Sequence, residues 1–129
     1  MLTLARVLGG LSGLLLLLTA YFHSTGIDGV RAAVEKAQMT GFFAEAFPVL
    51  WLFFSWHLMV IAMPLLWAAI KSPSWFFQAC IFCGLVALGD FFWVFSLAGW
   101  FPGTIILLSV VGLLLAVCVI LTRKQSAAR

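Results

Sequence analysis

The stretch Cys80-Ile-Phe-Cys-Gly-Leu-Val-Ala-Leu-Gly-Asp90-Phe-Phe-Trp-Val-Phe-Ser96 carries one carboxylate, that of Asp90, inside a run that is apolar enough to cross a bilayer. An ionised side chain at that depth costs at least about 2.5 to 3.5 kcal/mol unless it is paired or hydrated. The stretch therefore indicates a membrane-spanning helix in which one residue needs a specific partner.

The composition of the whole chain agrees with a membrane protein. Of its 129 residues 65% are hydrophobic and only 9% are charged, and a soluble domain with this balance would expose large apolar patches. The length accommodates one domain of about four spans of about 20 residues each. The net charge of +3 comes from Lys and Arg at the ends of apolar runs, so it indicates topology and not nucleic-acid binding.

The apolar runs predict an all-α bundle of four transmembrane helices, a single domain over residues 1–129 with spans at about 7–22, 41–70, 75–97 and 104–122. The first run resembles a signal peptide in charge and length, but Ser24-Thr25-Gly26 is a weak cleavage site, so we expect a retained helix. Pro48 and Pro64 are expected to bend the second span, because each removes a backbone donor.

Residues 28–39, between the first two spans, have apolar residues on one helical face and charged residues on the other. This pattern predicts a short external amphipathic helix on the membrane surface or over the mouth of the bundle, and a solvated connector is the alternative. We expect Asp28 to cap this helix and Thr40 to cap the second span.

The basic residues favour one orientation. In a four-span arrangement one side holds two of them, Arg31 and Lys36, and the other side holds Arg6, Lys71, Arg123, Lys124 and Arg129. The positive-inside rule then places both termini in the cytoplasm, most simply of a bacterial-type inner membrane. Every acidic residue and both histidines then belong to the outer half, which predicts a polar cavity that opens outward.

Asp90 is expected to face the interior of the bundle, because a stripe of small residues recurs with it at helical spacing: Cys80, Cys83, Gly84 and Ala87. His57 is the expected partner, since it lies roughly 15 Å and Asp90 roughly 10 Å below the outer boundary. The pair could carry a proton, bind a cation or anchor a ligand head group. The alternative is a structural hydrogen bond that joins two helices.

Two further polar residues of the second span have simpler interpretations. Glu45 could ring the mouth of the cavity with His23 and Asp28, or it could be a solvated interfacial side chain. Ser55 falls on the opposite side of the helix from His57, which argues against a Ser/His nucleophilic pair. We expect its hydroxyl to bond back to the Trp51 carbonyl.

Cys80 and Cys83 have the spacing of a redox dithiol, but a packing role for two small buried side chains is the alternative. The two histidines are separated by a whole helix, and neither has a second ligand at metal-binding spacing. The sequence therefore predicts no metal site, no cofactor and no assigned catalytic residue, and we favour a protein that is not an enzyme.

Small residues repeat at a spacing of three or four in three of the spans, as Gly9 and Gly13, Gly84 and Ala87, and Gly112 and Ala116. Such faces let helices approach closely. Because a bundle this small has little interior, we expect a homo-oligomer or docking on a larger membrane complex, with the first and last of these faces as seams.

Three functions remain open at this point. The first is an accessory or scaffold subunit that binds another membrane protein or lipid. The second is a small binder or carrier of a proton, a cation or an amphiphile, with an outward-facing polar cavity around Asp90 and His57. The third is a membrane-embedded redox enzyme that uses Cys80 and Cys83.

Overall fold

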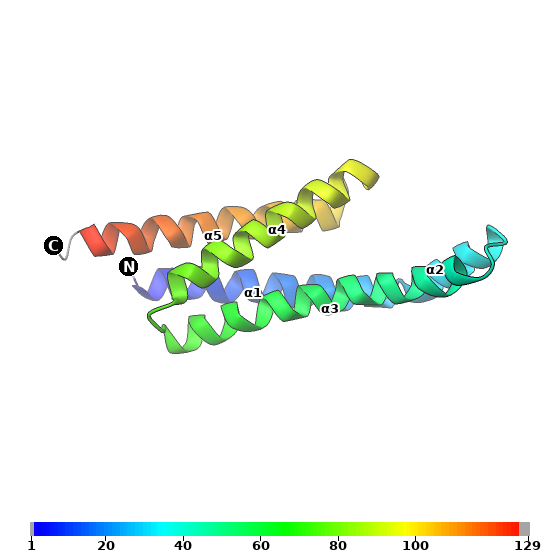
Figure 1. Cartoon of the computed structure of the whole chain (residues 1–129). Coiled ribbons are helices and arrows are strands. Elements are labelled where there is room, and N and C mark those ends of the chain that lie inside the picture. Colours follow the sequence, from blue (N-terminus) through cyan, green and yellow to red (C-terminus); the bar gives the residue numbers. More distant parts are fainter. Residues whose placement is uncertain (1, 127–129) are drawn as a thin grey trace.

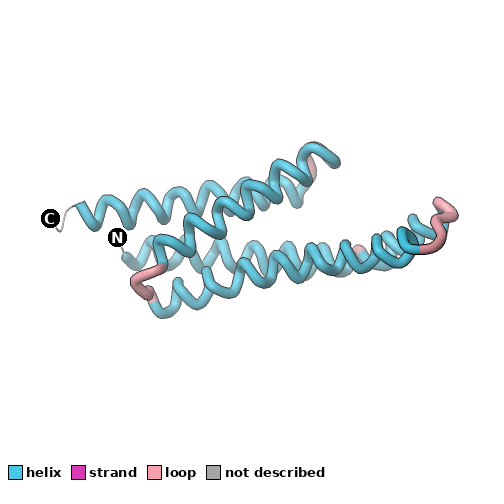
Figure 2. The backbone as a smooth tube through the Cα atoms, viewed as in Figure 1, coloured by secondary structure: helices cyan, strands magenta, loops and turns pink. Residues whose placement is uncertain are grey.

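The computed structural model describes residues 2–126, which form five helices and no strand. Figures 1 and 2 show the helices and the short loops that join them. In chain order the helices are α1 (Leu2–Thr25), α2 (Ile27–Lys36), α3 (Phe42–Lys71), α4 (Phe76–Ala98) and α5 (Pro102–Ser126).

Four helical segments are long and apolar enough to cross a membrane: Leu2–Lys36, Phe42–Lys71, Phe76–Ala98 and Pro102–Arg123. The prediction of an all-α chain with four such helices is therefore confirmed. The first span was predicted over about 7–22, whereas α1 begins at Leu2 and continues to Thr25. Both prolines of α3 lie inside one continuous helix.

The two chain ends and the α3–α4 connection lie at the same end of the molecule, and α2 lies beside the first turns of α3 at the opposite end (Figure 1). Helix α1 packs along both α3 and α5, and α4 packs along α5. Contact between α3 and α4 is more limited, and α4 rises away from α3 toward its own C-terminus. Helices α3 and α4 therefore diverge toward the end where α2 lies.

Close approach between α1 and its neighbours depends on two glycines. A methyl group at Gly9 would lie 2.9 Å from the ring of Phe76, and one at Gly13 would lie 2.7 Å from Leu66. Side chains of α3 and α4 therefore occupy the Gly9/Gly13 face within the chain, which differs from its expected use as a seam between chains. A methyl group at Gly112 would meet nothing within 4 Å.

The small residues of α4 also face the interior. Cys80, Cys83 and Ala87 are buried, and a methyl group at Gly84 would make ordinary contact with Leu114 of α5. This stripe brings α4 against its neighbours at the end of the bundle near the termini. It also fixes the rotation of α4, so that Asp90 points toward α3.

Arg6 closes the end of α3 near the termini. Its Nε donates to the Ala69 carbonyl at 2.7 Å and its Nη2 donates to the Ile70 carbonyl at 2.8 Å. Both carbonyls belong to the last turn of α3, where a cation also interacts favourably with the helix dipole. The arginine thus ties the start of α1 to the end of α3.

Both predicted N-caps are wrong. Gly26 caps α2 without a side-chain hydrogen bond, because α2 follows α1 after this one residue and Asp28 lies in its first turn. Asp28 pairs with Arg31 on the surface at 3.4 Å instead. Helix α3 begins after Gly41, whose φ of +64° suits glycine and leaves Thr40 outside the capping position.

Candidate functional site

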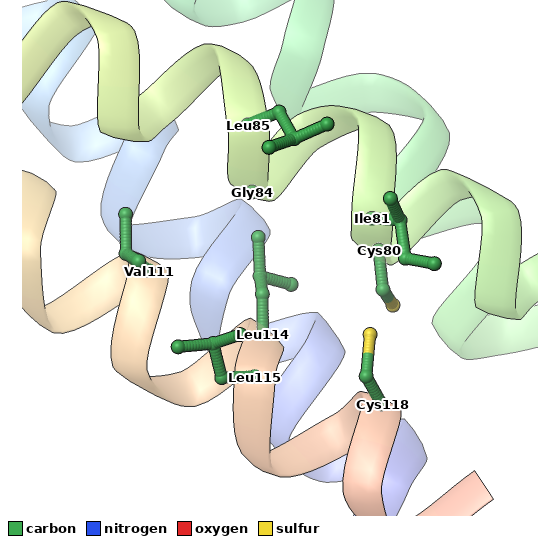
Figure 3. Close-up of a pocket in the computed structure, with 8 residues that line it drawn as sticks. All are labelled: Cys80, Ile81, Gly84, Leu85, Val111, Leu114, Leu115 and Cys118. Carbon is green, nitrogen blue, oxygen red and sulfur yellow. The ribbon is translucent and has the colours of Figure 1, made fainter. Parts of the chain in front are cut away.

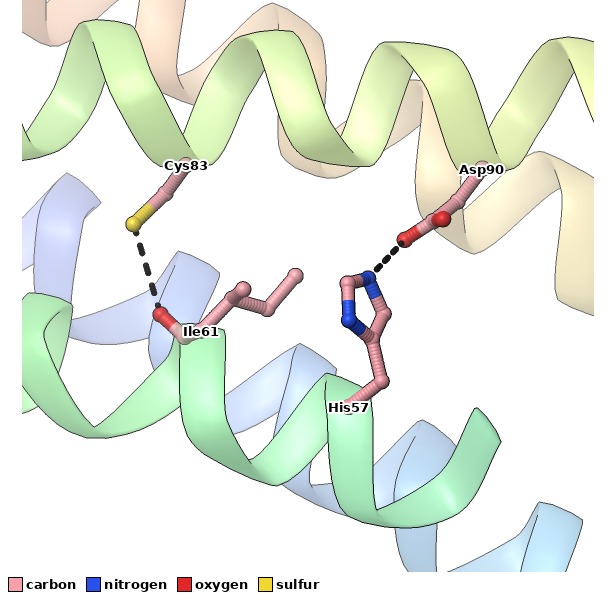
Figure 4. A network of polar contacts seen from close by, with 4 residues as sticks. All are labelled: His57, Ile61, Cys83 and Asp90. Atoms are coloured by element: carbon pink, nitrogen blue, oxygen red, sulfur yellow. Dashed lines mark hydrogen bonds and ion pairs between the residues drawn. The ribbon is translucent and has the colours of Figure 1, made fainter. Parts of the chain in front are cut away.

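His57 and Asp90 come together between α3 and α4, as Figure 4 shows. Nε2 of His57 lies 3.2 Å from Oδ2 of Asp90, and the side chains are 33% and 16% exposed. Asp90 reaches this position because the small residues on its face of α4 are buried, and His57 reaches it from the facing side of α3. At this burial each group gains from the other as a hydrogen-bond partner.

A second polar contact joins the same two helices nearer the termini. The thiol of Cys83 donates to the Ile61 carbonyl at 3.4 Å, in the turn of α3 that precedes Pro64 (Figure 4). The stripe from Cys83 to Asp90 therefore meets α3 at two levels, two turns of α4 apart. Beyond Asp90 the helices separate.

An apolar cleft of about 480 Å³ occupies the space beyond the His57–Asp90 pair. The wall on the α3 side consists of Phe47, Leu50, Trp51 and Phe54. The opposite wall consists of Val94, Leu97 and Ala98 of α4, together with Phe101. His23 and Val30 complete the lining, so among the described residues the cleft contains one titratable side chain, the imidazole of His23.

His23 is held in place by three neighbours on α3. Its Nδ1 lies 2.9 Å from Oγ of Ser55, and its backbone carbonyl accepts a hydrogen bond of 2.7 Å from Nε1 of Trp51. The Trp51 indole stacks on the imidazole with the ring centroids 3.9 Å apart. The Phe54 ring meets the imidazole edge-on at 5.0 Å. The imidazole is therefore fixed in orientation at the wall of the cleft.

Phe54 lies near both histidines. Its ring centroid lies 5.0 Å from that of His23 and 6.2 Å from that of His57. The cleft wall includes His23 and Phe54, whereas His57 and Asp90 are outside it. The cleft is thus apolar, and the His57–Asp90 pair, around which a polar cavity is expected, does not line it.

The expected hydrogen-bond partner of the Ser55 hydroxyl is wrong. We expected its hydroxyl to bond back to the Trp51 carbonyl, but the structure gives it Nδ1 of His23 as partner. The sequence did carry a signal for this contact. The buried positions of α1 follow one face through Gly13, Leu16 and Ala20, and His23 is the next position on that face.

Glu45 lies apart from the other candidate residues. It is exposed and lies 12 residues before His57, which corresponds to about 18 Å along α3. It lines a surface groove formed by side chains of α3 alone, with Phe42 and Phe43 among them. Asp28 is also exposed, and neither acid lines the cleft that holds His23.

The cysteines of the Cys80/Cys83 pair face different helices. Cys83 donates to the Ile61 carbonyl of α3, whereas Cys80 points toward Cys118 of α5 across a small apolar cavity of about 140 Å³ (Figure 3). All three are free thiols. The geometry gives each of them a packing partner and does not place the two thiols of the Cys-x-x-Cys spacing against each other.

The described part of the chain contains no group of three His, Cys, Asp or Glu side chains that could hold a metal ion. In and beside the cleft, the polar side chains described above form two hydrogen-bonded pairs, His57 with Asp90 and His23 with Ser55. Comparison of the chain with protein-family models, with curated proteins and with solved structures finds no match.

Proposed function

We propose that this chain is a four-span membrane protein that binds an amphiphile from the bilayer in the cleft between α3 and α4. The observation that carries the proposal is the separation of these helices beyond His57 and Asp90, which leaves an apolar volume of about 480 Å³ with one imidazole. Ligand sites in proteins have volumes of this order, and they combine apolar walls with a few placed polar groups.

The walls favour an amphiphile over an ion. A bare cation or anion would lose its hydration shell against aromatic and aliphatic side chains, and the one titratable side chain among the described lining residues cannot replace that shell. An acyl or isoprenoid chain, in contrast, matches the walls. Because α4 diverges from α3, such a chain can enter sideways from lipid (Figure 1).

The orientation belongs to the same proposal. Arg6, Lys71 and Arg123 belong to the end where both termini and the α3–α4 connection lie, and Arg129 lies outside the described residues. With that end in the cytoplasm, as the positive-inside rule favours, α2 and the cleft lie at the outer side of a bacterial-type inner membrane. A reporter fused to the C-terminus that proves external would contradict this orientation.

The proposal is tested by filling the cleft. Val94 lines it, and Val94→Trp places an indole in the space that the ligand would occupy. Val119 on α5 is exposed and supplies a matched control, Val119→Trp. Native mass spectrometry after mild detergent extraction should show a retained amphiphile on the wild-type protein and on the control, and loss of most of it from Val94→Trp. Equal retention by all three would contradict the proposal.

A second candidate is an accessory subunit that binds another membrane protein. It is supported by the start of α3, where Phe42, Phe43 and Phe47 are 78%, 62% and 45% exposed. Exposed aromatic clusters of this kind occur at interfaces. A photoreactive residue at position 43 should then crosslink to one protein of defined mass in native membranes, whereas crosslinks to lipid alone would contradict this role.

In another version of the second candidate, the partner is a second copy of this chain and the protein forms a homo-oligomer. Its seam would lie around Gly112, where the surface of α5 is open, and not at Gly9 and Gly13. Ala116, the other small residue of that face, is half-buried. A Gly112→Leu substitution should then shift the oligomer toward monomer in cross-linking experiments, and an unchanged distribution would contradict this seam.

A further inference from the structure

We infer that His23 recognises an uncharged carbonyl oxygen of the bound amphiphile, the ester carbonyl of an acyl lipid, by donating a hydrogen bond from Nε2. This inference rests on the proposed function, because it requires an amphiphile in the cleft. It adds the chemical group that is recognised and the atom of the protein that recognises it.

The hydrogen-bond partners of Ser55 indicate which ring nitrogen of His23 carries the proton. Hydroxyls elsewhere in these helices, such as those of Ser12 and Thr19, donate to the carbonyl four residues earlier. Among the described residues Ser55 Oγ is buried, makes no such bond to its own helix, and has Nδ1 of His23 as its partner. A buried hydroxyl donates its proton where an acceptor is within reach. Nδ1 therefore accepts, and Nε2 of the neutral imidazole carries the hydrogen.

That Nε2–H group is left for a ligand. Nδ1 is occupied by Ser55, one ring face by Trp51, and an edge contact by Phe54. Within the part of the chain that the structure describes, Nε2 has no hydrogen-bond partner and the ring lines the cleft. A ligand atom that binds there must be an acceptor, because the free group is a donor.

The charge of the lining selects a neutral acceptor. No Lys or Arg is among the described residues that line the cleft. Arg31 of the neighbouring α2 is exposed and is paired with Asp28. An anion in the cleft would therefore be desolvated without a counter-charge, which is costly. A carbonyl oxygen accepts the same hydrogen bond without that cost.

The depth of His23 matches that of lipid ester groups. Arg6 and His23 are 17 residues apart on α1, which corresponds to about 26 Å along a helix. The hydrocarbon core of a bilayer is about 30 Å thick. With Arg6 at one boundary, His23 lies near the other, where the ester carbonyls begin. Trp100 and Phe101 lie in the α4–α5 turn next to the cleft and suit an interfacial aromatic belt.

The test uses protein labelled with ¹⁵N at His and Trp, in nanodiscs of ether-linked phosphatidylcholine, so that the bilayer itself offers no carbonyl. The indole N–H of Trp51 reports occupancy of the cleft, and the imidazole resonances of His23 report the hydrogen bond. Four probes are compared: methyl myristate (ester), hexadecane (no acceptor), myristyl sulfate (anion) and a decyl-substituted benzoquinone (ring carbonyl).

Without a probe, His23 should show a protonated Nε2 and an unprotonated Nδ1. Methyl myristate should shift both Trp51 and the Nε2–H resonance, and should bind about tenfold more tightly than hexadecane, as expected for one net hydrogen bond. His23→Phe keeps the ring stack and should abolish this preference. In Ser55→Ala the Nδ1 atom of His23 loses its hydrogen-bond donor. Both imidazole tautomers should then be populated, and the preference for methyl myristate over hexadecane should decrease.

The results that would contradict this inference differ from one another. Equal binding of ester and hexadecane, or a protonated Nδ1 in the wild-type protein, overturns the carbonyl inference and leaves the cleft as an apolar lipid site. If myristyl sulfate binds more tightly than methyl myristate, the inference of a neutral acceptor is overturned. If the benzoquinone binds more tightly than methyl myristate, the inference that the acceptor is an ester carbonyl is overturned. If no probe shifts Trp51, the proposed function itself fails. If His23→Phe does not fold, Ser55→Ala decides the inference.

Discussion

The His57 imidazole and the Asp90 carboxylate join α3 and α4 at the level where these helices begin to separate. Each side chain is only partly exposed. If one were substituted, water could replace it only incompletely as the hydrogen-bond partner of the other. The contact therefore joins the two helices about one turn away from Phe54 and Val94, which line the cleft, and it contributes to stability.

A double-mutant cycle measures this contact. His57→Ala, Asp90→Ala and the double variant should give a coupling free energy of about 0.5 to 2 kcal/mol, the range found for polar contacts inside membrane proteins. Reversible unfolding in mixed micelles supplies the free energies. The surface pair Arg31 and Asp28 is the control, with side chains 63% and 88% exposed, and should couple by less. Equal coupling in both cycles would contradict a specific role for the deeper pair.

At the level of residues, the sequence predicts those contacts that depend on depth alone. His57 and Asp90 fall at similar depths on antiparallel helices, so their proximity follows from counting turns. The partnership of His23 with Ser55 does not follow from such counting, because the predicted first span ended at Phe22 and left His23 in a turn. Three further residues of helix bring the imidazole onto the face that packs on α3.

Helix α1 packs along both α3 and α5 and approaches side chains of α3 and α4 closely. Glycine at positions 9 and 13 leaves room for Phe76 and Leu66. The buried Ser12 bonds back to the Leu8 carbonyl, so it adds no unpaired polar group to this interface.

Gly13→Ala should therefore destabilise the bundle. The added methyl would lie 2.7 Å from Leu66 and 3.2 Å from the backbone oxygen of Ala62, which cannot rotate away. Overpacking of this kind costs about 1 to 3 kcal/mol. Gly112→Ala is the control, since it gains the same helix propensity and meets open space. Thermal unfolding in detergent should separate the two variants, and equal midpoints would contradict the packing of α1.

The helix starts show where sequence rules fail at this level. Asp28 and Thr40 have the side chains of good caps, yet Gly26 and Gly41 occupy the capping positions. In the first case α1 continues almost directly into α2, so there is no open helix start for Asp28 to cap. In the second, a positive φ at Gly41 sets the direction of the chain. Backbone geometry decides both helix starts, and the residue preferences for capping positions carry no information about that geometry.

For the whole molecule, apolar length and the turns predict four long helices with both ends of the chain on one side. They do not predict which helices pair. The position of α1 between α3 and α5, and the divergence of α4 from α3, depend on side-chain fit along entire helices. The cleft is a consequence of that divergence. The sequence predicts a cavity that opens outward, but it does not predict apolar walls or the imidazole of His23 among them.

The most direct measurement for this account is photocrosslinking with a lipid that carries a diazirine in its acyl chain, followed by mapping of the modified peptides. An amphiphile in the cleft predicts adducts concentrated on Trp51, Val94 and Leu97, and their loss in Val94→Trp, above a weaker background on exposed side chains such as Val119. Adducts spread evenly over all exposed helix faces, with no enrichment in the cleft and no effect of Val94→Trp, would contradict it.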